Sequence, residues 1–279
     1  MEIHDRPTGS PQETKWPLAY SSESSPVALP SWRNLKTYII IGLACLILSA
    51  AAASFGQERL DYPITLFINR AANSVLLGDI TQALQLNTFM AVVPLAAIWL
   101  IWFDIPNAAS RASIVAGVIG ASFAAIGSRV FQLILPTHLR PLHDSALAFV
   151  APHGADPSLL NHWNSFPSDT GSLIFGLATV IAISRPTLGI AAFVWAALCA
   201  SSRVFQGLHY PSDITGAVGL SVAIVCASQH PFIRRMCLVF PRWAAERTAI
   251  FYAGAFVASY QVATLFWDVR AIASILKHG

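Results

Sequence analysis

One short stretch of the sequence combines residue types that can perform nucleophilic chemistry. The segment SRVFQGLHYPSD, residues 202–213, contains Ser202, Arg203, His209 and Asp213. Residues four apart share one face of a helical turn, so the carboxylate of Asp213 can bind one ring nitrogen of His209. Such a carboxylate fixes the tautomer and leaves the other nitrogen free to attack an electrophile. The planar, permanently charged guanidinium of Arg203 suits a phosphate group.

A second stretch predicts an anion site. The phrase FPSD at 166–169 opens an apolar run and is nearly repeated as YPSD at 210–213. The first amides of a helix have no internal partner and carry the positive end of the helix dipole, so a helix start can bind an anion. Ser168 can cap this helix or donate its hydroxyl to the anion. Arg140, stiffened by the proline after it, is a further candidate phosphate ligand.

Apolar runs surround these polar stretches. Hydrophobic residues make up 55% of the 279 residues and charged residues 11%, whereas soluble domains carry about 25% charge. The composition predicts an all-α, polytopic integral membrane bundle with six core spans and an additional C-terminal span. Several runs are shorter than the roughly 20 residues of a span, which is expected where their ends lie in polar, protein-lined surroundings. The runs are 37–54, 88–103, 112–128, 171–184, 187–202, 212–229 and 249–267.

The chain divides into three parts by composition. Residues 1–35 are rich in Pro and Ser and predict a disordered cytoplasmic tail. Residues 36–230 form the transmembrane core. Residues 231–279 combine a basic cytoplasmic loop with a C-terminal transmembrane helix. The stretch 117–127, rich in Gly, Ala and Ser, is expected to pack closely against neighbouring helices.

Basic residues predict the orientation in the membrane. They cluster before the first span and after the sixth, and the positive-inside rule places both regions in the cytoplasm. An even number of spans must separate them, and six fit. Three polar segments then face outward, and the first of these predicts an amphipathic helix in the interface. The outward segments are 55–86, 129–170 and 203–211.

These residues resemble a known family. The pattern Ser-Arg, five residues, His, three residues, Asp is similar to the third signature motif of the type-2 phosphatidic acid phosphatase (PAP2) superfamily, which also contains bacterial polyprenyl-diphosphate phosphatases and vanadium haloperoxidases. Arg140–Pro141 resembles the end of the first motif and Pro167–Ser168 the start of the second. The resemblance covers roughly residues 37–230. Four residues match the third motif at every position: Ser202, Arg203, His209 and Asp213.

The resemblance implies a membrane hydrolase acting on a lipid phosphate or diphosphate of the polyprenyl or phosphatidyl type. His209 would form a phosphohistidine and Asp213 would orient it. We expect a bacterial inner-membrane location with the active site facing the periplasm, and no nucleic-acid partner; the oligomeric state stays open. No cofactor or metal is expected, because the sequence shows no clustered carboxylates for Mg²⁺. The implied phosphate-binding residues are Arg140, Ser168, Asp169, Thr170, Arg203 and Arg129.

The sequence departs from the family pattern at two positions. The first motif opens with a Lys, and Leu133 stands there instead. Arg129, one helical turn earlier on the same face, is the replacement candidate, and Gln132 is a weaker one. The second motif ends in a His that protonates the leaving oxygen, and Thr170 occupies its place. Threonine cannot act as a general acid near neutral pH.

Three groups could supply the missing proton: His143, His162 and Asp169. His143 ranks first, because it lies three residues from Arg140 and both could face one phosphate. Alternatively, no acid is required, since a diphosphate releases a phosphate monoester, a better leaving group than an alcohol. Two other functions stay open: a phosphotransferase on the same site, and a catalytically impaired protein that binds or transports a lipid phosphate. A channel or general transporter is disfavoured, because the sequence shows no inverted repeat.

Overall fold

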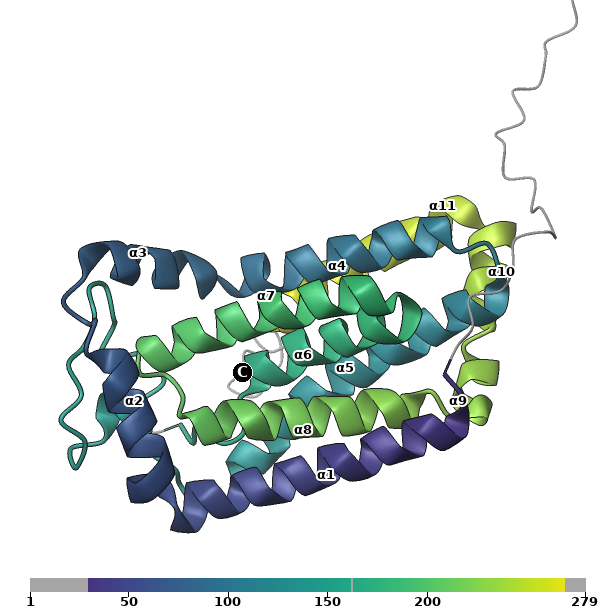
Figure 1. Ribbon diagram of the computed structural model, residues 1–279. Coiled ribbons are helices and arrows are strands. Elements are labelled where there is room, and N and C mark those ends of the chain that lie inside the picture. The colour runs from purple at the N-terminus through teal and green to yellow at the C-terminus, as the bar shows by residue number, and fades with distance from the viewer. Residues whose placement is uncertain (1–29, 162, 269–279) are drawn as a thin grey trace, which may run out of the picture.

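The computed structural model describes residues 30–161 and 163–268, and within these ranges the regular structure is entirely helical (Figure 1). The elements are α1 (Trp32–Phe55), the π-helical turn η1 (Gln57–Asp61), α2 (Tyr62–Asn69), α3 (Val75–Leu84), α4 (Asn87–Asp104), α5 (Ala108–Ile134), the 3₁₀ turn η2 (Pro141–His143), α6 (Asp169–Ser184), α7 (Pro186–Phe205), α8 (Pro211–Ser228), α9 (Pro231–Met236), α10 (Val239–Glu246) and α11 (Thr248–Ala263).

Each of the seven apolar runs forms a helix, which confirms a helical membrane bundle. Four helices, α1, α5, α7 and α8, are long and apolar enough to cross a membrane on their own. Helices α3 and α4 together form a fifth candidate, bent by 51°. Helices α6 and α11 are apolar but have only 16 residues each. Length and composition therefore support four or five spans among the described residues, where the sequence predicted six and a seventh.

The short helix α6 occupies the centre of the bundle. It packs against α5, α7 and α8 (Figure 1), and every residue from Thr170 to Ile181 is buried. Because protein rather than lipid surrounds α6, it does not have to match the thickness of the bilayer. Its first turn lies among polar groups instead, as the shortness of the run predicted.

Small residues allow α5 to approach two neighbours closely. A Cβ added at Gly117 would lie 2.7 Å from Cγ2 of Val180 on α6, and one added at Gly120 would lie 2.8 Å from the hydroxyl of Ser228 on α8. Either contact is shorter than those that real Cβ atoms make, so a larger residue at either position would force the neighbouring side chain to shift. The predicted close packing of 117–127 is confirmed.

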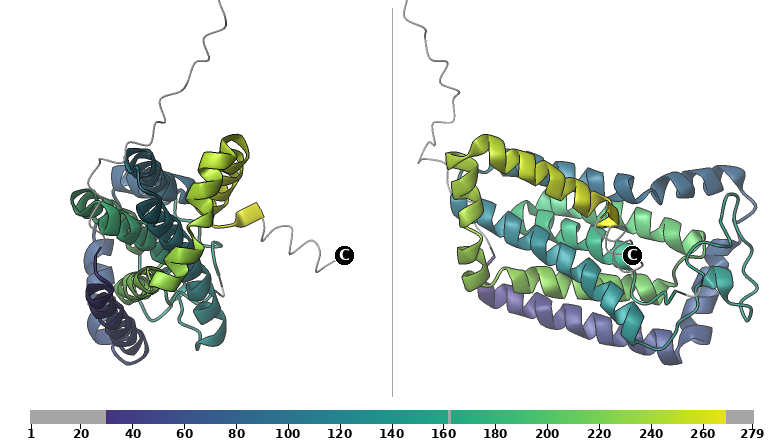
Figure 2. Two further views of the ribbon diagram at one scale, coloured as in Figure 1. Left: turned by 90° about the vertical axis from the view of Figure 1, so that its right-hand side faces the viewer. Right: turned by 180° about the vertical axis from the view of Figure 1, so that it is seen from behind.

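The described residues of the two basic regions lie at one end of the bundle. The rings of Trp32, at the start of α1, and His230, at the end of α8, are 4.9 Å apart. Figures 1 and 2 show α9 and α10 at this same end, with α2 and the long loop after α5 at the other. Two regions at the same end require an even number of crossings between them, and their cytoplasmic location stays a prediction.

The first polar segment differs from the prediction of one amphipathic helix. It contains η1, α2 and α3, with a turn at 70–74 that ends α2. The break arises because the hydroxyl of Ser74 accepts a hydrogen bond from the amide of Leu77 and starts α3 as a separate helix. At the N-terminus, α1 begins within the predicted tail, and residues 1–29 of that tail lie outside the described residues.

Candidate active site

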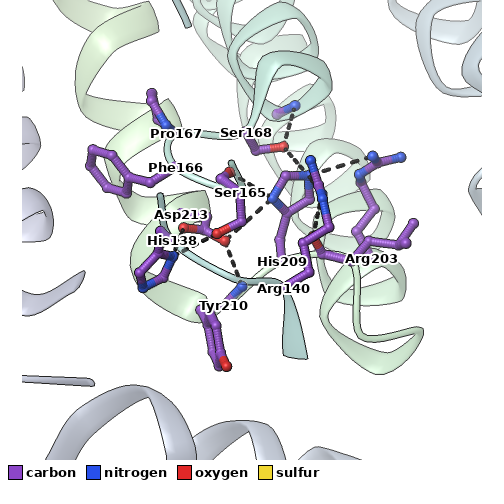
Figure 3. A network of polar contacts seen from close by, with 12 residues as sticks. His138, Arg140, Ser165, Phe166, Pro167, Ser168, Arg203, His209, Tyr210 and Asp213 are labelled. Carbon is purple, nitrogen blue, oxygen red and sulfur yellow. Dashed lines mark hydrogen bonds and ion pairs between the residues drawn. The ribbon is translucent and has the colours of Figure 1, made fainter. Parts of the chain in front are cut away.

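The two Pro-Ser-Asp phrases meet at the polar end of the bundle. The amide of Ser168 donates to the carbonyl of Asp213 at 3.2 Å, so the starts of α6 and α8 lie side by side (Figure 3). The Ser168 hydroxyl accepts from the amide of Gly171 at 3.1 Å and thereby caps α6. The two phrases thus bring the capped start of α6 next to the loop that carries His209.

His209 is completely buried, and its contacts define which nitrogen is free. Nδ1 lies 3.3 Å from Oδ2 of Asp213 and 3.1 Å from the carbonyl of Ser165. Both neighbours are acceptors, so Nδ1 carries the proton and Nε2 keeps its lone pair. The predicted pairing of His209 with Asp213 therefore gives a ring whose Nε2 can act as a nucleophile.

Three hydrogen-bond donors surround Nε2 of His209. The hydroxyl of Ser168 lies 3.2 Å away, a terminal nitrogen of Arg140 3.4 Å away and a terminal nitrogen of Arg203 3.5 Å away. Figure 3 shows the three side chains converging on one edge of the imidazole, with Asp213 on the opposite side. A tetrahedral anion in front of Nε2 would contact all three donors.

The two arginines are buried and only partly hydrogen-bonded. Arg140 is 2% exposed and donates to the carbonyls of Leu208 and Asn164, whereas Arg203 is 6% exposed. Among residues 30–161 and 163–268, neither Nε has a hydrogen-bond partner. Buried guanidinium donors are costly when unpaired, so this pair is suited to receive an anion.

Burial and charge shift the pKa values of two groups in the loops. Burial, followed by the positive charge of Arg140, lowers the pKa of His209 to about 4, against the opposing effect of Asp213. Burial and the charge of Arg203 lower the pKa of Arg140 to about 10. At neutral pH the imidazole of His209 is therefore neutral, as a nucleophile must be. Arg140 is charged, as a phosphate ligand must be.

A cavity of about 570 Å³ opens beside these groups. Arg129 and Asp169 form an ion pair at its edge, with 3.0 Å between nitrogen and oxygen. The guanidinium of Arg129 also lies over the Trp163 ring, 4.8 Å from its centroid. Five of the residues assigned to phosphate binding from the sequence line the cavity: Arg129, Arg140, Asp169, Thr170 and Arg203.

Comparison with known proteins identifies the family of this segment. Residues 139–235 match the family model described as the PAP2 superfamily. We call these matched residues the PAP2 domain. No curated protein and no solved structure matches the chain. The resemblance inferred from the motifs is confirmed over these residues, and a PAP2 domain supports a phosphatase-type activity.

The PAP2 domain does not bring His143 into the group around His209. His143 lies in η2, and its Nε2 is 3.0 Å from the carbonyl of Leu159 at the rim of the cavity, in an exposed contact. Gln132 has another partner, since its amide donates to the carbonyl of Pro167 at 2.7 Å and holds the loop before α6. His162 lies outside the described residues.

A second histidine beside Asp213 was not predicted from the sequence. His138 Nδ1 lies 2.6 Å from the hydroxyl of Ser165 and 3.5 Å from Oδ1 of Asp213. Burial favours the neutral ring, but the hydrogen bond and charge of Asp213 outweigh it and raise the pKa of His138. The carboxylate of Asp213 therefore lies between two imidazoles, and no local spacing connects residue 138 with residue 213.

Two more carboxylates missed at the sequence level fix the loops of the PAP2 domain. Asp61, 1% exposed, accepts from the amide and the hydroxyl of Ser212 at 2.9 and 2.6 Å and so holds the start of α8. Asp144 accepts from the hydroxyls of Tyr62 and Tyr210 at 2.5 and 2.9 Å. In the described part of the chain, no three His, Cys, Asp or Glu side chains are grouped to hold a metal ion.

Proposed function

We propose that the protein is a membrane phosphatase that hydrolyses a lipid phosphate or diphosphate through a phosphohistidine. One observation carries this proposal: the Nε2 lone pair of His209 faces two buried guanidinium groups and the Ser168 hydroxyl. Guanidinium forks and hydroxyl donors recognise phosphoryl oxygens. A neutral imidazole in their midst can attack the phosphorus that they hold.

The reaction proceeds in two displacements. Nε2 of His209 attacks phosphorus in line, and the bond from phosphorus to the leaving oxygen breaks, which gives a phosphohistidine and the dephosphorylated lipid or lipid monophosphate. A water molecule then attacks the phosphorus, the phosphorus–nitrogen bond breaks, and inorganic phosphate leaves with the neutral imidazole restored. Asp213 holds Nδ1–H throughout and stabilises the positive ring of the intermediate.

The positive field for this reaction comes from the chain itself. Arg140 and Arg203 bind the phosphoryl oxygens, Ser168 donates its hydroxyl, and the start of α6 contributes its dipole. Arg129, at the cavity edge and paired with Asp169, takes the role of the lysine that opens the first motif of the PAP2 superfamily. We therefore propose a reaction without a metal ion.

The apolar helices around the site support a lipid substrate in the bilayer. The lipid tail stays among the helices while its phosphate enters the cavity next to His209. We propose a bacterial inner-membrane protein with this cavity on the periplasmic side and the N-terminus in the cytoplasm, because the described residues of both basic regions lie at the opposite end of the bundle.

The leaving group determines whether an acid is required. We propose His143 as the proton donor for a monoester, and it must turn from the Leu159 carbonyl to act. Thr170 stands buried in the cavity lining where the family has its acid. A diphosphate, which releases a phosphate monoester, can react without this proton. We therefore propose diphosphates of the polyprenyl type as the preferred substrates.

A substrate panel tests this function. Phosphate release from undecaprenyl diphosphate, undecaprenyl phosphate and phosphatidic acid is measured in EDTA, and the diphosphate is expected to react fastest. Thr170→His is expected to raise monophosphate turnover about ten-fold, because it restores an acid to the cavity, and to raise diphosphate turnover less. Loss of activity in EDTA contradicts the metal-free reaction. Equal gains for both substrate types contradict the leaving-group argument.

The pH dependence of kcat/KM follows from the shifted pKa values. As the pH rises through about 4, His209 loses its proton and becomes nucleophilic, so kcat/KM rises there. Above about 10 the charge of Arg140 is lost and kcat/KM falls. Ionisation of the substrate phosphate also affects the pH profile. Comparing two substrates whose phosphates ionise at different pH values distinguishes this effect, because only the inflection caused by the substrate shifts between them. If kcat/KM instead rises with an inflection near pH 6.5 that is the same for both substrates, the lowered pKa of His209 is contradicted.

A further inference from the structure

Helix α11 lies outside the family match, which ends at residue 235, yet it reaches the active-site cavity. It begins beside α10 at the basic end of the bundle and runs back along α4 (Figures 1 and 2). Leu265 and Trp267, just beyond its end, line the cavity next to Arg140 and Arg203. A segment that follows the matched family region therefore closes one side of the site.

A second, apolar cavity of about 380 Å³ lies between α4, α5, α10 and α11. Helix α11 is fixed to α4 by two hydrogen bonds, from the indole nitrogen of Trp99 to Ser259 at 3.1 Å and from that of Trp102 to Tyr252 at 3.0 Å. On the side of α11 that faces α5, the cavity has room for a ligand. We call this cavity the α11 groove; its lining includes Leu95, Trp99, Ile114, Val118, Phe251 and Val262.

The α11 groove and the active-site cavity lie one after the other along the chain segments that line them. Val262 lines the groove, and Leu265, three residues later, lines the active-site cavity. Leu86, the residue just before α4, lines the active-site cavity, and Leu95 on α4 lines the groove, an offset of roughly 13 Å at 1.5 Å per residue. The groove therefore lies beyond the active-site cavity along the same segments, in the direction away from the phosphate site.

We propose that the α11 groove binds the hydrocarbon chain of the lipid whose phosphate lies at His209. This inference rests on the proposed phosphatase function and adds to it a chain-binding site built by α11. In a bilayer, lipid and groove are equally apolar, so binding depends on the fit of the chain against the walls rather than on escape from water. The groove therefore selects chains that are long enough to fill it and orients the head group towards Nε2 of His209.

Gly254 provides a clean test of this site. It lines the α11 groove, and a Cβ added there meets no atom within 4 Å. A phenylalanine at this position would start from a Cβ with open space around it and would place its ring at the groove. The preceding residue, Ala253, is exposed and does not line the groove, so Ala253→Phe adds the same ring to an exposed position of α11 as a matched control.

The measurement compares a substrate with a six-carbon chain and one with a sixteen-carbon chain, both with the same phosphate head, in mixed micelles. Gly254→Phe is expected to lower kcat/KM about ten-fold for the long chain and to leave the short chain within about two-fold, whereas Ala253→Phe changes neither. If Gly254→Phe does not fold, Val118→Phe blocks the same groove from α5 with the same expectation.

The outcomes separate the two proposals. If the groove-blocked variant and the wild type are equally active on the long-chain substrate, the groove does not bind the substrate chain. This result overturns the proposed chain-binding site. An equal loss on both chain lengths overturns it as well, because the defect is then not one of chain recognition. A wild-type protein that releases no phosphate from either substrate overturns the phosphatase function itself.

Discussion

His209→Ala is expected to reduce phosphate release by roughly four to six orders of magnitude, the range seen when an enzyme loses its nucleophile. The reason is geometric: Nε2 of His209 is the lone pair towards which Ser168, Arg140 and Arg203 all point. Rapid quenching of the wild type with a phosphorus-labelled lipid should trap an acid-labile phosphohistidine. The variant should give none, although its substrate affinity is largely retained.

A matched control is available in His153→Ala. His153 is exposed and pairs with Asp79 at 3.7 Å, away from the catalytic group. We expect less than about a two-fold change in kcat for this variant, as is usual for surface substitutions. A His209→Ala protein that remains folded and still turns over refutes the mechanism. A wild type that binds lipid phosphates but never becomes labelled would instead be the catalytically impaired binding protein.

The second large effect is expected for Arg203→Lys, which should lower kcat/KM about 10² to 10³-fold. An ammonium is a point charge and cannot reproduce the planar fork with which Arg203 would hold two phosphoryl oxygens. Its terminal nitrogen lies 3.5 Å from Nε2 of His209, and its buried Nε has no hydrogen-bond partner among the described residues. Inhibition by inorganic phosphate should weaken in parallel, because the same fork binds the product.

Arg185→Lys serves as the comparison for this substitution. Arg185 pairs with Asp104 at the junction of α6 and α7, at the end of α6 away from the cavity. We expect its activity to stay within about two-fold of the wild type, since an exposed ion pair contributes little. Comparable losses in both lysine variants would show a general effect of arginine on folding. Wild-type activity in Arg203→Lys would exclude this side chain from phosphate binding.

Much of the site was predictable because it is local. His209 and Asp213 are four residues apart, and helical geometry alone brings a carboxylate to an imidazole at that spacing. The cap that Ser168 forms on α6 follows from the preference of helix starts for serine. The apolar runs predicted the helices, since a chain of this composition must bury its backbone polar groups in helices within a bilayer.

Other features required the packed structure. Sequence could not show that His138 shares Asp213 with His209, that Asp61 holds Ser212, or that His143 faces Leu159 rather than the phosphate site. Each of these contacts joins residues on separate segments. Their distances depend on how loops and helices pack, and the periodicity of the sequence does not predict this packing.

The sequence by itself determined the chemistry that is available: a nucleophile with its orienting carboxylate, two arginines, a capped helix start and the apolar helices that carry them. The tertiary structure alone decided which nitrogen is free, which donors surround it, and that α11 lines a groove beside the site. The physical reason is one of range. Helix geometry determines which residues are neighbours within about one turn. The contacts between distant segments are determined only by how these segments pack together.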